Sequence, residues 1–395
     1  MTENIKKFPV NWIEGMKINK NHFIELQDNF EDTIRDTRNL IVNQMYYGLL
    51  NTSQNSPFQF SIFIDTHSEL SVDIKLLKAV TPGGGRIEIT ENTGPFFEKV
   101  LLSRLVKKDN IYYVILNVNP FKRVPTGNQN MEEVPPRFPF AINNYYITIT
   151  SESDLNQNNI GHLQIPLAKF NNTNDTFEII KTYIPPSTVV NSHPNLVTFF
   201  ESYQTFFKRI EFNSVQIIQK IKFRNKTEDE NVIANMVIIS CEKSLSYVEN
   251  QITATKWMGY NAKPIDILEK IVSFARILKN CLDTFSGDGK EMLFNYFSEW
   301  TDTKSGDYEK LFTDTINLTV TIFDMQPTIQ QSSNFISKID ELFGILNQMD
   351  YIGRKKDTGI FVNENVFTNE KATSAIFGES KKDDKPSSSP SFLAD

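Results

Sequence analysis

Several features that would direct a functional assignment are scarce in this sequence of 395 residues. Its two cysteines, Cys241 and Cys281, lie in segments expected to be helical, which fits buried thiols in a reducing compartment better than a disulfide framework. No run of about eighteen uninterrupted apolar residues occurs, and no apolar core of a secretory signal follows Lys6 and Lys7. These absences predict a cytoplasmic protein without direct membrane insertion.

Positive charge is also scarce, because the formal net charge is −7 and no long Lys/Arg block is present. A surface that follows nucleic-acid phosphates is therefore not expected. The glycine-rich run from Gly83 to Arg86 lacks the Lys-Ser/Thr pair of a phosphate-binding loop and precedes the strand-like residues 87–90. A tight hairpin turn is the preferred interpretation of this run.

Signals for catalysis are weak. None of the four histidines lies in a zinc-protease or Cys-x-x-Cys context, and no Gly-x-Ser-x-Gly elbow occurs. Asp65, His67 and Glu69 alternate along a presumed strand, so their side chains share one face and resemble ligands for a divalent metal. The solvent-facing side of a half-buried strand gives the same pattern and is preferred. We therefore expect no enzyme, no catalytic residue, no cofactor and no metal.

The patterns that are present predict an α+β chain of three parts. From Ile18 to about Tyr47 the apolar spacing indicates one long helix. Between Pro57 and about Ile184, alternating segments such as Leu70–Ile74 and 145–150 indicate an antiparallel β-sandwich shell. We assign residues 1–187 to the helix with its β domain, residues 188–352 to a helical bundle and residues 353–395 to a flexible tail.

The bundle is predicted from helical periodicity. Ser192 is expected to cap a helix, Thr227 and Glu230 to form a capping box, and Pro264 to open a further helix. The first of these helices carries an aromatic stripe, and its members are Leu196, Phe199, Phe200, Tyr203, Phe206, Phe207 and Ile210. Such a stripe is usually core, but the surface of Phe199, Phe206 and Ile210 is also a candidate oligomer interface.

Three sequence segments, in the same order along the chain, resemble those of a known family. The residues Val10-Asn11-Trp12-Ile13-Glu14-Gly15-Met16, followed by Asn21-His22-Phe23, resemble the W-x-E-G-M and Q-H-F opening of TssK baseplate proteins of bacterial type VI secretion systems, with Asn21 in place of the Gln. The segment 70–89 is similar to that family's strand, turn and strand. The segment 183–196 is similar to its exit from the β domain into the bundle.

The resemblance implies a structural adaptor that forms a homotrimer. Its N-terminal shell would bind TssF/TssG-type wedge proteins of the baseplate through six residues, Trp12, Glu14, Gly15, Met16, His22 and Phe23. The family also bridges to the membrane complex through a C-terminal head domain. The residues after Asp350 are too few for that domain, so we expect a divergent, short subtype located at the inner-membrane-docked baseplate.

Two other classes remain open at this point. A phage-like trimeric receptor-binding or tail-fibre protein would share the sandwich-and-bundle plan, and a shallow carbohydrate site lined by Tyr112, Tyr113, Tyr145 or Tyr146 would favour it. A metal-dependent hydrolase using Asp65, His67 and Glu69 is the weaker option.

Overall fold

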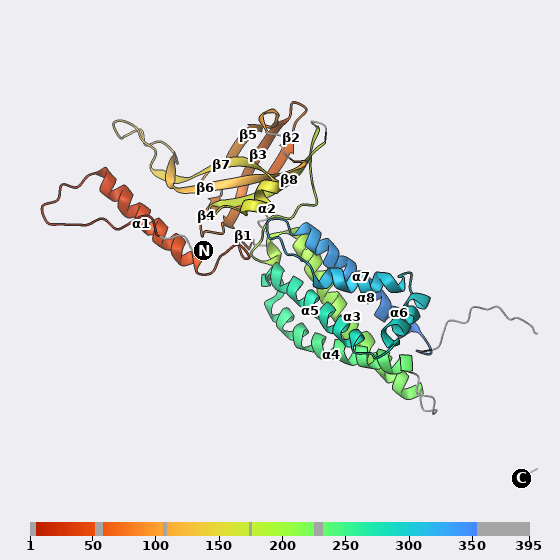
Figure 1. Cartoon of the computed structure of the whole chain (residues 1–395). Helices are drawn as coiled ribbons and strands as arrows, with labels where there is room; N and C mark the ends of the chain where they lie inside the picture. Colours follow the sequence, from red (N-terminus) through yellow and green to blue (C-terminus); the bar gives the residue numbers. More distant parts are fainter. Residues whose placement is uncertain (1–4, 52–57, 106–108, 174–175, 225–231, 354–395) are drawn as a thin grey trace, which may run out of the picture. The chain divides into compact units, whose positions relative to one another are not determined.

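The computed structural model describes residues 5–51, 58–105, 109–173, 176–224 and 232–353. The elements below all belong to one unit of the chain and are drawn in Figure 1. The capping box proposed for Thr227 and Glu230 and the tail after Gly353 lie outside the described residues.

Two antiparallel sheets follow the N-terminal helix (Figure 1). The strands are β1 (Gly48–Leu49), β2 (Gln59–Ile64), β3 (Glu69–Val80), β4 (Arg86–Ile89), β5 (Phe96–Leu101), β6 (Ile111–Thr126), β7 (Phe140–Ser151), β8 (Gln164–Thr173) and β9 (Thr176–Ile179). In the first sheet the long β3 pairs with β1, β2, β4 and β5, and the second sheet has the order β7-β6-β8-β9. Two short helical segments lie between strands: η1 (Leu102–Arg104) between β5 and β6, and α2 (Glu152–Asn158) between β7 and β8.

The two sheets share one apolar core. Leu70, Val72 and Ile74 project alternately from β3 and are fully buried, and they join Val114 and Leu116 of β6 in the same cluster. Residues 112–118 of β6 are all buried, so this central strand is covered on both faces, and only alternate residues belong to the core shared with β3. Two antiparallel sheets that share one apolar core are the arrangement of a β-sandwich. The predicted antiparallel β fold is confirmed.

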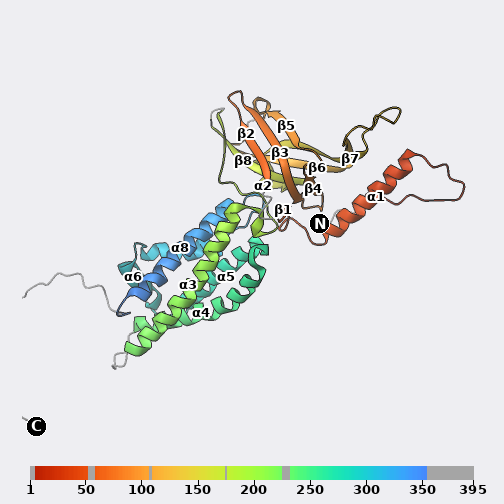
Figure 2. The ribbon, with the colours of Figure 1, turned by 180° about the vertical axis from the view of Figure 1, so that it is seen from behind.

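Helices make up the rest of the described chain. They are η2 (Val190–Ser192), α3 (Pro194–Arg224), α4 (Val232–Met258), η3 (Gly259–Asn261), α5 (Pro264–Asp283), α6 (Gly289–Trp300), α7 (Ser305–Ile316) and α8 (Gln326–Gln348) (Figure 2). Pro264 begins α5, as predicted. Ser192 does not cap α3, because its hydroxyl donates to the carbonyl oxygen of Leu49 at 3.1 Å, whereas His193 Nδ1 accepts the N–H of Asn195 at 3.2 Å.

The aromatic stripe of α3 lies inside the bundle. Phe199, Phe206 and Ile210 are at most 5% exposed and pack in the chain's own helical core. Phe206 meets the ring of Phe274 on α5 at 5.7 Å between centroids. This corrects their assignment as oligomer-interface residues, because side chains that are buried within one protomer have no surface to offer to another.

A buried polar cluster joins the second sheet to the segment before α8. Asp324 Oδ2 accepts from Lys169 Nζ at 2.6 Å and from the Tyr113 hydroxyl at 3.0 Å. Glu152 lies 3.4 Å from the same ammonium group. The Tyr183 hydroxyl donates to the Phe323 carbonyl oxygen at 2.6 Å, within the same small core. Strands and helices are therefore tied by ionic and hydrogen-bonded contacts as well as by apolar packing.

The predicted strand through Asp65, His67 and Glu69 is wrong at its centre. Residues 65–68 form the turn between β2 and β3, in which Asp65 Oδ1 accepts the N–H groups of His67 (2.8 Å) and Glu69 (2.9 Å). These hydrogen bonds make an Asx turn, so Asp65 stabilises the hairpin and the three side chains do not share a strand face.

The glycine run at 83–85 is the tight β3–β4 turn that was predicted. Gly84 has φ +80°, and a Cβ atom there would lie 2.4 Å from the carbonyl oxygen of Arg35. Glycine is required at this position both by the backbone angle and by the close approach of α1.

Candidate docking surface

Helix α1 (Lys20–Asn39) buries charged residues and exposes apolar ones. A helix packed on a domain usually shows the opposite pattern. Its buried residues are Asp28, Asp32 and Arg35. Phe23, Phe30 and Ile34 are 58%, 58% and 46% exposed. Asp32 follows Phe23 by about two and a half helical turns, which places the ion pair and the exposed stripe on opposite sides of α1.

The inward side of α1 is held by charged hydrogen bonds. Arg35 forms an ion pair with Asp32 at 2.8 Å and donates through Nη1 to the Gly83 carbonyl oxygen at 3.1 Å. Asp28 pairs with Arg123 on β6 at 2.8 Å. These contacts fix the helix on the turn and on β6 without using its apolar residues.

Asp32 also binds the chain's N-terminal segment. Its Oδ2 accepts the backbone N–H groups of Lys6 at 2.6 Å and Lys7 at 2.9 Å. Burial raises the pKa of the Asp32 carboxyl, but the hydrogen bonds from Lys7, Lys6 and Arg35 outweigh burial and leave that pKa below its usual value. Ionised Asp32 therefore holds the N-terminal segment against α1.

The residues predicted to bind the wedge proteins lie where this segment turns back into α1. The Trp12 ring meets His22 edge-on at 6.0 Å, and Trp12 is 46% exposed. The Met16 N–H donates to the Ile13 carbonyl oxygen at 3.2 Å and closes a turn in which Gly15 has φ +79°. His22 Nδ1 accepts the N–H of Asn19 and so takes part in the capping box of α1. The structure thus brings Trp12, Glu14, Gly15, Met16, His22 and Phe23 together in one stretch of surface.

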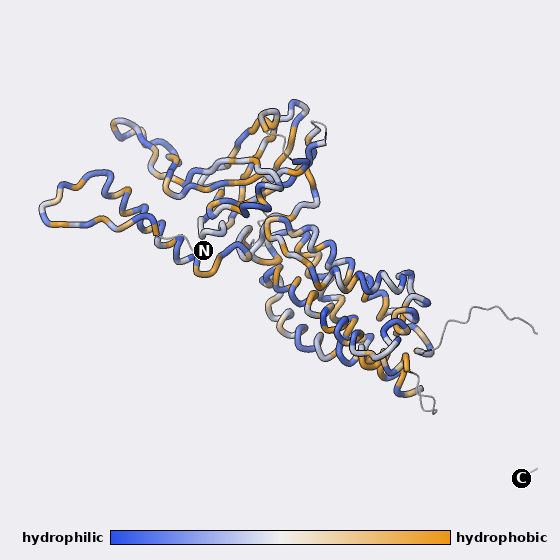
Figure 3. The backbone as a smooth tube through the Cα atoms, viewed as in Figure 1, coloured by the Kyte–Doolittle hydropathy of each residue, from blue (hydrophilic) through white to orange (hydrophobic). Residues whose placement is uncertain are grey.

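The rest of this surface was not predicted from the sequence. Hydrophobic positions are interleaved with hydrophilic ones along the N-terminal segment and α1 (Figure 3). Those with exposed large side chains include Phe8, Trp12, Ile13, Ile18, Phe23, Ile24, Phe30 and Ile34. We call these eight residues the N-terminal apolar surface. Their helical periodicity is visible in the sequence, but periodicity alone does not tell which side of a helix faces the domain.

The carbohydrate-binding tyrosines of the alternative interpretation do not form a shallow site. Tyr112 and Tyr113 are 2% and 1% exposed, and Tyr112 stacks on Phe170 within the sandwich core. Tyr145 uses its hydroxyl to accept the backbone N–H of Glu88 at 3.2 Å. Only Tyr146 among the four is largely exposed, at 43%.

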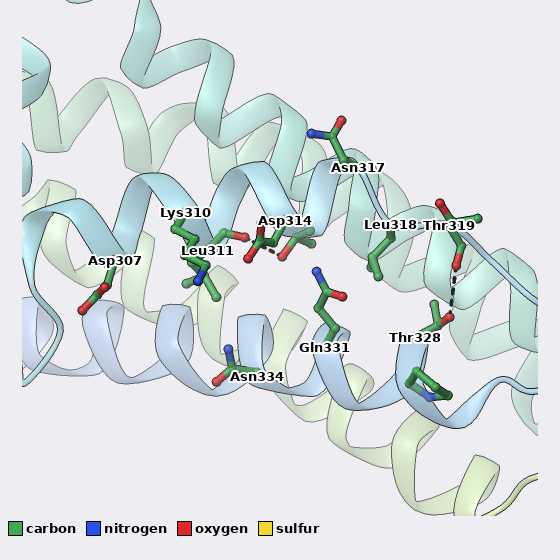
Figure 4. Close-up of a pocket in the computed structure, with 12 residues that line it drawn as sticks. Asp307, Lys310, Leu311, Asp314, Asn317, Leu318, Thr319, Thr328, Gln331 and Asn334 are labelled. Carbon is green, nitrogen blue, oxygen red and sulfur yellow. Dashed lines mark hydrogen bonds between the residues drawn. The ribbon is translucent and has the colours of Figure 1, made fainter. Parts of the chain in front are cut away.

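A polar cleft of about 770 Å³ lies between α7 and α8 (Figure 4). Asp307, Lys310 and Asp314 line it from α7, and Gln331 and Asn334 line it from α8. Its lining residues are mostly polar, and no histidine or cysteine is among them.

No group of three or more His, Cys, Asp or Glu side chains in residues 5–353, outside the gaps given above, is arranged to hold a metal ion. Within the same ranges no helix is long and apolar enough to cross a membrane.

The chain was also compared with known proteins. No protein-family model matches it, and no curated protein matches it either. Solved structures with a similar backbone include the crystal structure of TssK, with a TM-score of 0.47 and 11% identity over 86% of this chain and 70% of that chain. A TssK-TssF-TssG baseplate subcomplex of the type VI secretion system has a TM-score of 0.46 and 12% identity over 84% of this chain and 100% of that chain. TssK from the type VI system of EAEC, in complex with a nanobody, has a TM-score of 0.43 and 12% identity over 80% and 96%.

Proposed function

We propose that this chain is a structural adaptor of a type VI secretion baseplate, of the TssK kind, and that it binds TssF/TssG-type wedge proteins. The observation that carries the proposal is the orientation of α1, which buries an ion pair and leaves Phe23, Phe30 and Ile34 in solvent. Large apolar side chains that stay exposed along one side of a helix are typical of a protein interaction site. The three ordered sequence markers supply the family, and the first of them forms part of the N-terminal apolar surface.

The docking residues are Trp12, Glu14, Gly15, Met16, His22 and Phe23. Trp12 and Phe23 are the aromatic anchors, because large rigid side chains contribute most to binding when a partner covers them. Gly15 permits the turn that presents Trp12 beside His22. Glu14 is exposed at the same turn and can take part in a charged contact at the rim.

The remaining parts of the proposal follow the family resemblance. The protein would act as a cytoplasmic homotrimer without catalytic activity, with a β domain to residue 187 and a bundle over residues 188–352. It would link the wedge proteins to the membrane-associated complex. Because Phe199, Phe206 and Ile210 are buried, trimer contacts would use other residues.

Capture of co-expressed TssF- and TssG-type proteins of the same secretion system tests the proposal. Trp12→Ala and Met16→Ala are each expected to weaken capture by about 1 kcal/mol or more, the usual effect of truncating an interface anchor. Trp257→Ala is the matched control, because Trp257 is also an exposed tryptophan, at 82%, but lies on α4. Failure of the unaltered protein to capture either wedge protein refutes the proposal, and unchanged capture by the double variant removes these two residues from the docking surface.

A further inference from the structure

The chain's N-terminal segment and α1 are bonded to each other. Asp32 of α1 accepts the backbone N–H groups of Lys6 and Lys7, and Asn29 Nδ2 donates to the Lys7 carbonyl oxygen at 2.8 Å. These bonds close the segment back onto the helix that follows it. We call residues 5–39 the N-terminal unit.

Charged side chains join the N-terminal unit to the β domain. Arg35 and Arg38 donate to two carbonyl oxygens of the β3–β4 turn, at 3.1 and 3.4 Å. Asp28 pairs with Arg123 of β6 at 2.8 Å. The ammonium group of Lys7 lies over an aromatic ring of β6, 5.3 Å from its centroid. Each of these contacts has a charged group on at least one side.

The N-terminal unit takes no part in the apolar cores. None of its residues belongs to the three apolar clusters of the described chain, and none is among the partly buried apolar residues that pack against those clusters. The first residues along the described chain that join a cluster are Tyr47 and Leu49, which are 1% and 0% exposed. Separation of the unit would therefore leave all three cores intact.

A short exposed segment follows the unit. Leu40 and Ile41 are 78% and 70% exposed, whereas the next residue, Val42, is 7% exposed. Gln44 Nε2 then donates to the Ile160 carbonyl oxygen at 2.9 Å, which ties the chain to the β domain. A few exposed residues at the end of an element, directly before a segment that is held in place, are suited to be a hinge.

Separation at this junction costs less than separation of an apolar interface. Apolar groups lose free energy in proportion to the area that water reaches, whereas separated charged groups regain their hydration. Two ion pairs also stay within the unit, since Asp32 keeps Arg35 at 2.8 Å and Asp28 keeps Lys7 at 3.4 Å. Parts of a protein with few buried apolar contacts are the ones that open without global unfolding.

We infer that the N-terminal unit is a hinged arm, which separates from the β domain as one body and pivots at Leu40 and Ile41. All eight residues of the N-terminal apolar surface belong to this unit, so the arm carries the docking surface with it. A partner bound there can change its direction relative to the β domain without unfolding either. The inference holds whichever partner covers the surface, so it stands or falls independently of the proposed function.

Hydrogen exchange of the unaltered protein tests the arm. A separated helix of 20 residues is marginally stable in water, so the amides of α1 exchange when the unit opens. Urea accelerates an opening in proportion to the surface that it exposes. In 1 M urea, exchange in residues 20–39 is expected to rise less than about twofold, and exchange in the buried residues 112–118 of β6 about tenfold.

Two arginine variants on one hairpin give a second test. Arg123→Gln removes the ion pair with Asp28 and is expected to accelerate exchange throughout residues 20–39 about tenfold, with less than about twofold change in residues 112–118. Arg137→Gln is the matched control, because Arg137 pairs with Glu133 near the tip of the same hairpin and should leave both segments unchanged.

Three results would overturn the arm. Equal acceleration of residues 20–39 and 112–118 by urea would mean that α1 opens only when the whole β domain unfolds. Unchanged exchange of residues 20–39 in Arg123→Gln would mean that the charged junction does not hold the unit. Acceleration confined to the ends of α1 would show local fraying instead of separation as one body.

Discussion

Replacing Asp324 with alanine is expected to destabilise the protein by about 3 kcal/mol, because it breaks a buried charged cluster from one side. The side chain of Asp324 is 7% exposed and that of Lys169 14%. The substitution removes a 2.6 Å bond to the ammonium group and a 3.0 Å bond to the Tyr113 hydroxyl. A hydrogen bond to a charged group contributes about 1.5 to 3 kcal/mol and a neutral one about 1 kcal/mol.

Two further variants divide the expected loss in the free energy of unfolding into its parts. Asp324→Asn keeps an oxygen acceptor and loses only the charge, so a smaller loss of about 1 to 2 kcal/mol is expected. Glu152 remains 3.4 Å from Lys169 but is 39% exposed, so it compensates only in part. Adding Lys169→Met to Asp324→Ala removes the unpaired ammonium group and should recover about 1 kcal/mol or more of the loss.

Guanidinium denaturation followed by circular dichroism measures these differences. Because the cluster connects the sheet to the segment before α8, Asp324→Ala is also expected to separate the unfolding of strands from that of helices into two transitions. A loss below about 0.5 kcal/mol with a single unchanged transition would refute the reasoning, since surface substitutions have effects of that size.

Three other predictions concern single groups. Asp32→Asn should release the N-terminal segment and α1, which faster amide exchange would show. The unaltered protein should lose the same protection as the pH falls through the lowered native pKa of Asp32, because the ionised carboxylate is the form that accepts these hydrogen bonds. Burial lowers the pKa of His193 to about 4, so the unfolded chain binds the proton more readily and the free energy of unfolding falls from about pH 6.5 towards pH 4. His193→Asn should flatten that slope when denaturation is measured at several pH values. Burial raises the pKa of Cys241 to about 12 and also raises that of Cys281, so thiol reagents at pH 8 should label neither until the protein unfolds, and rapid labelling of the native protein would contradict their burial.

The sandwich and the helices were predictable because their patterns depend on burial within one chain. Leu70, Val72 and Ile74 alternate in the sequence and are all buried in the structure. Phe206 and Ile210 follow a 3.6-residue period and lie in the helical core, which is the usual place for such a stripe. Their alternative role as an interface was wrong because composition does not show how much aromatic surface a bundle can enclose.

The candidate site was only partly predictable. Trp12 and Phe23 were found through the family resemblance, whereas the spacing of Phe30 and Ile34 was used only to predict a helix. The inward face of α1 depends on Gly83, whose carbonyl oxygen accepts from Arg35 across 48 positions of sequence. Long-range polar contacts of this kind leave no periodic signal in the sequence.

The inverted packing of α1 also bears on how the protein is produced. Because the N-terminal apolar surface stays in solvent after folding, it remains available to other chains. An excess of the chain over any partner that covers this surface then favours non-specific association, and co-production of such a partner relieves it. The ratio at which the two chains are made would then determine the yield of properly folded protein.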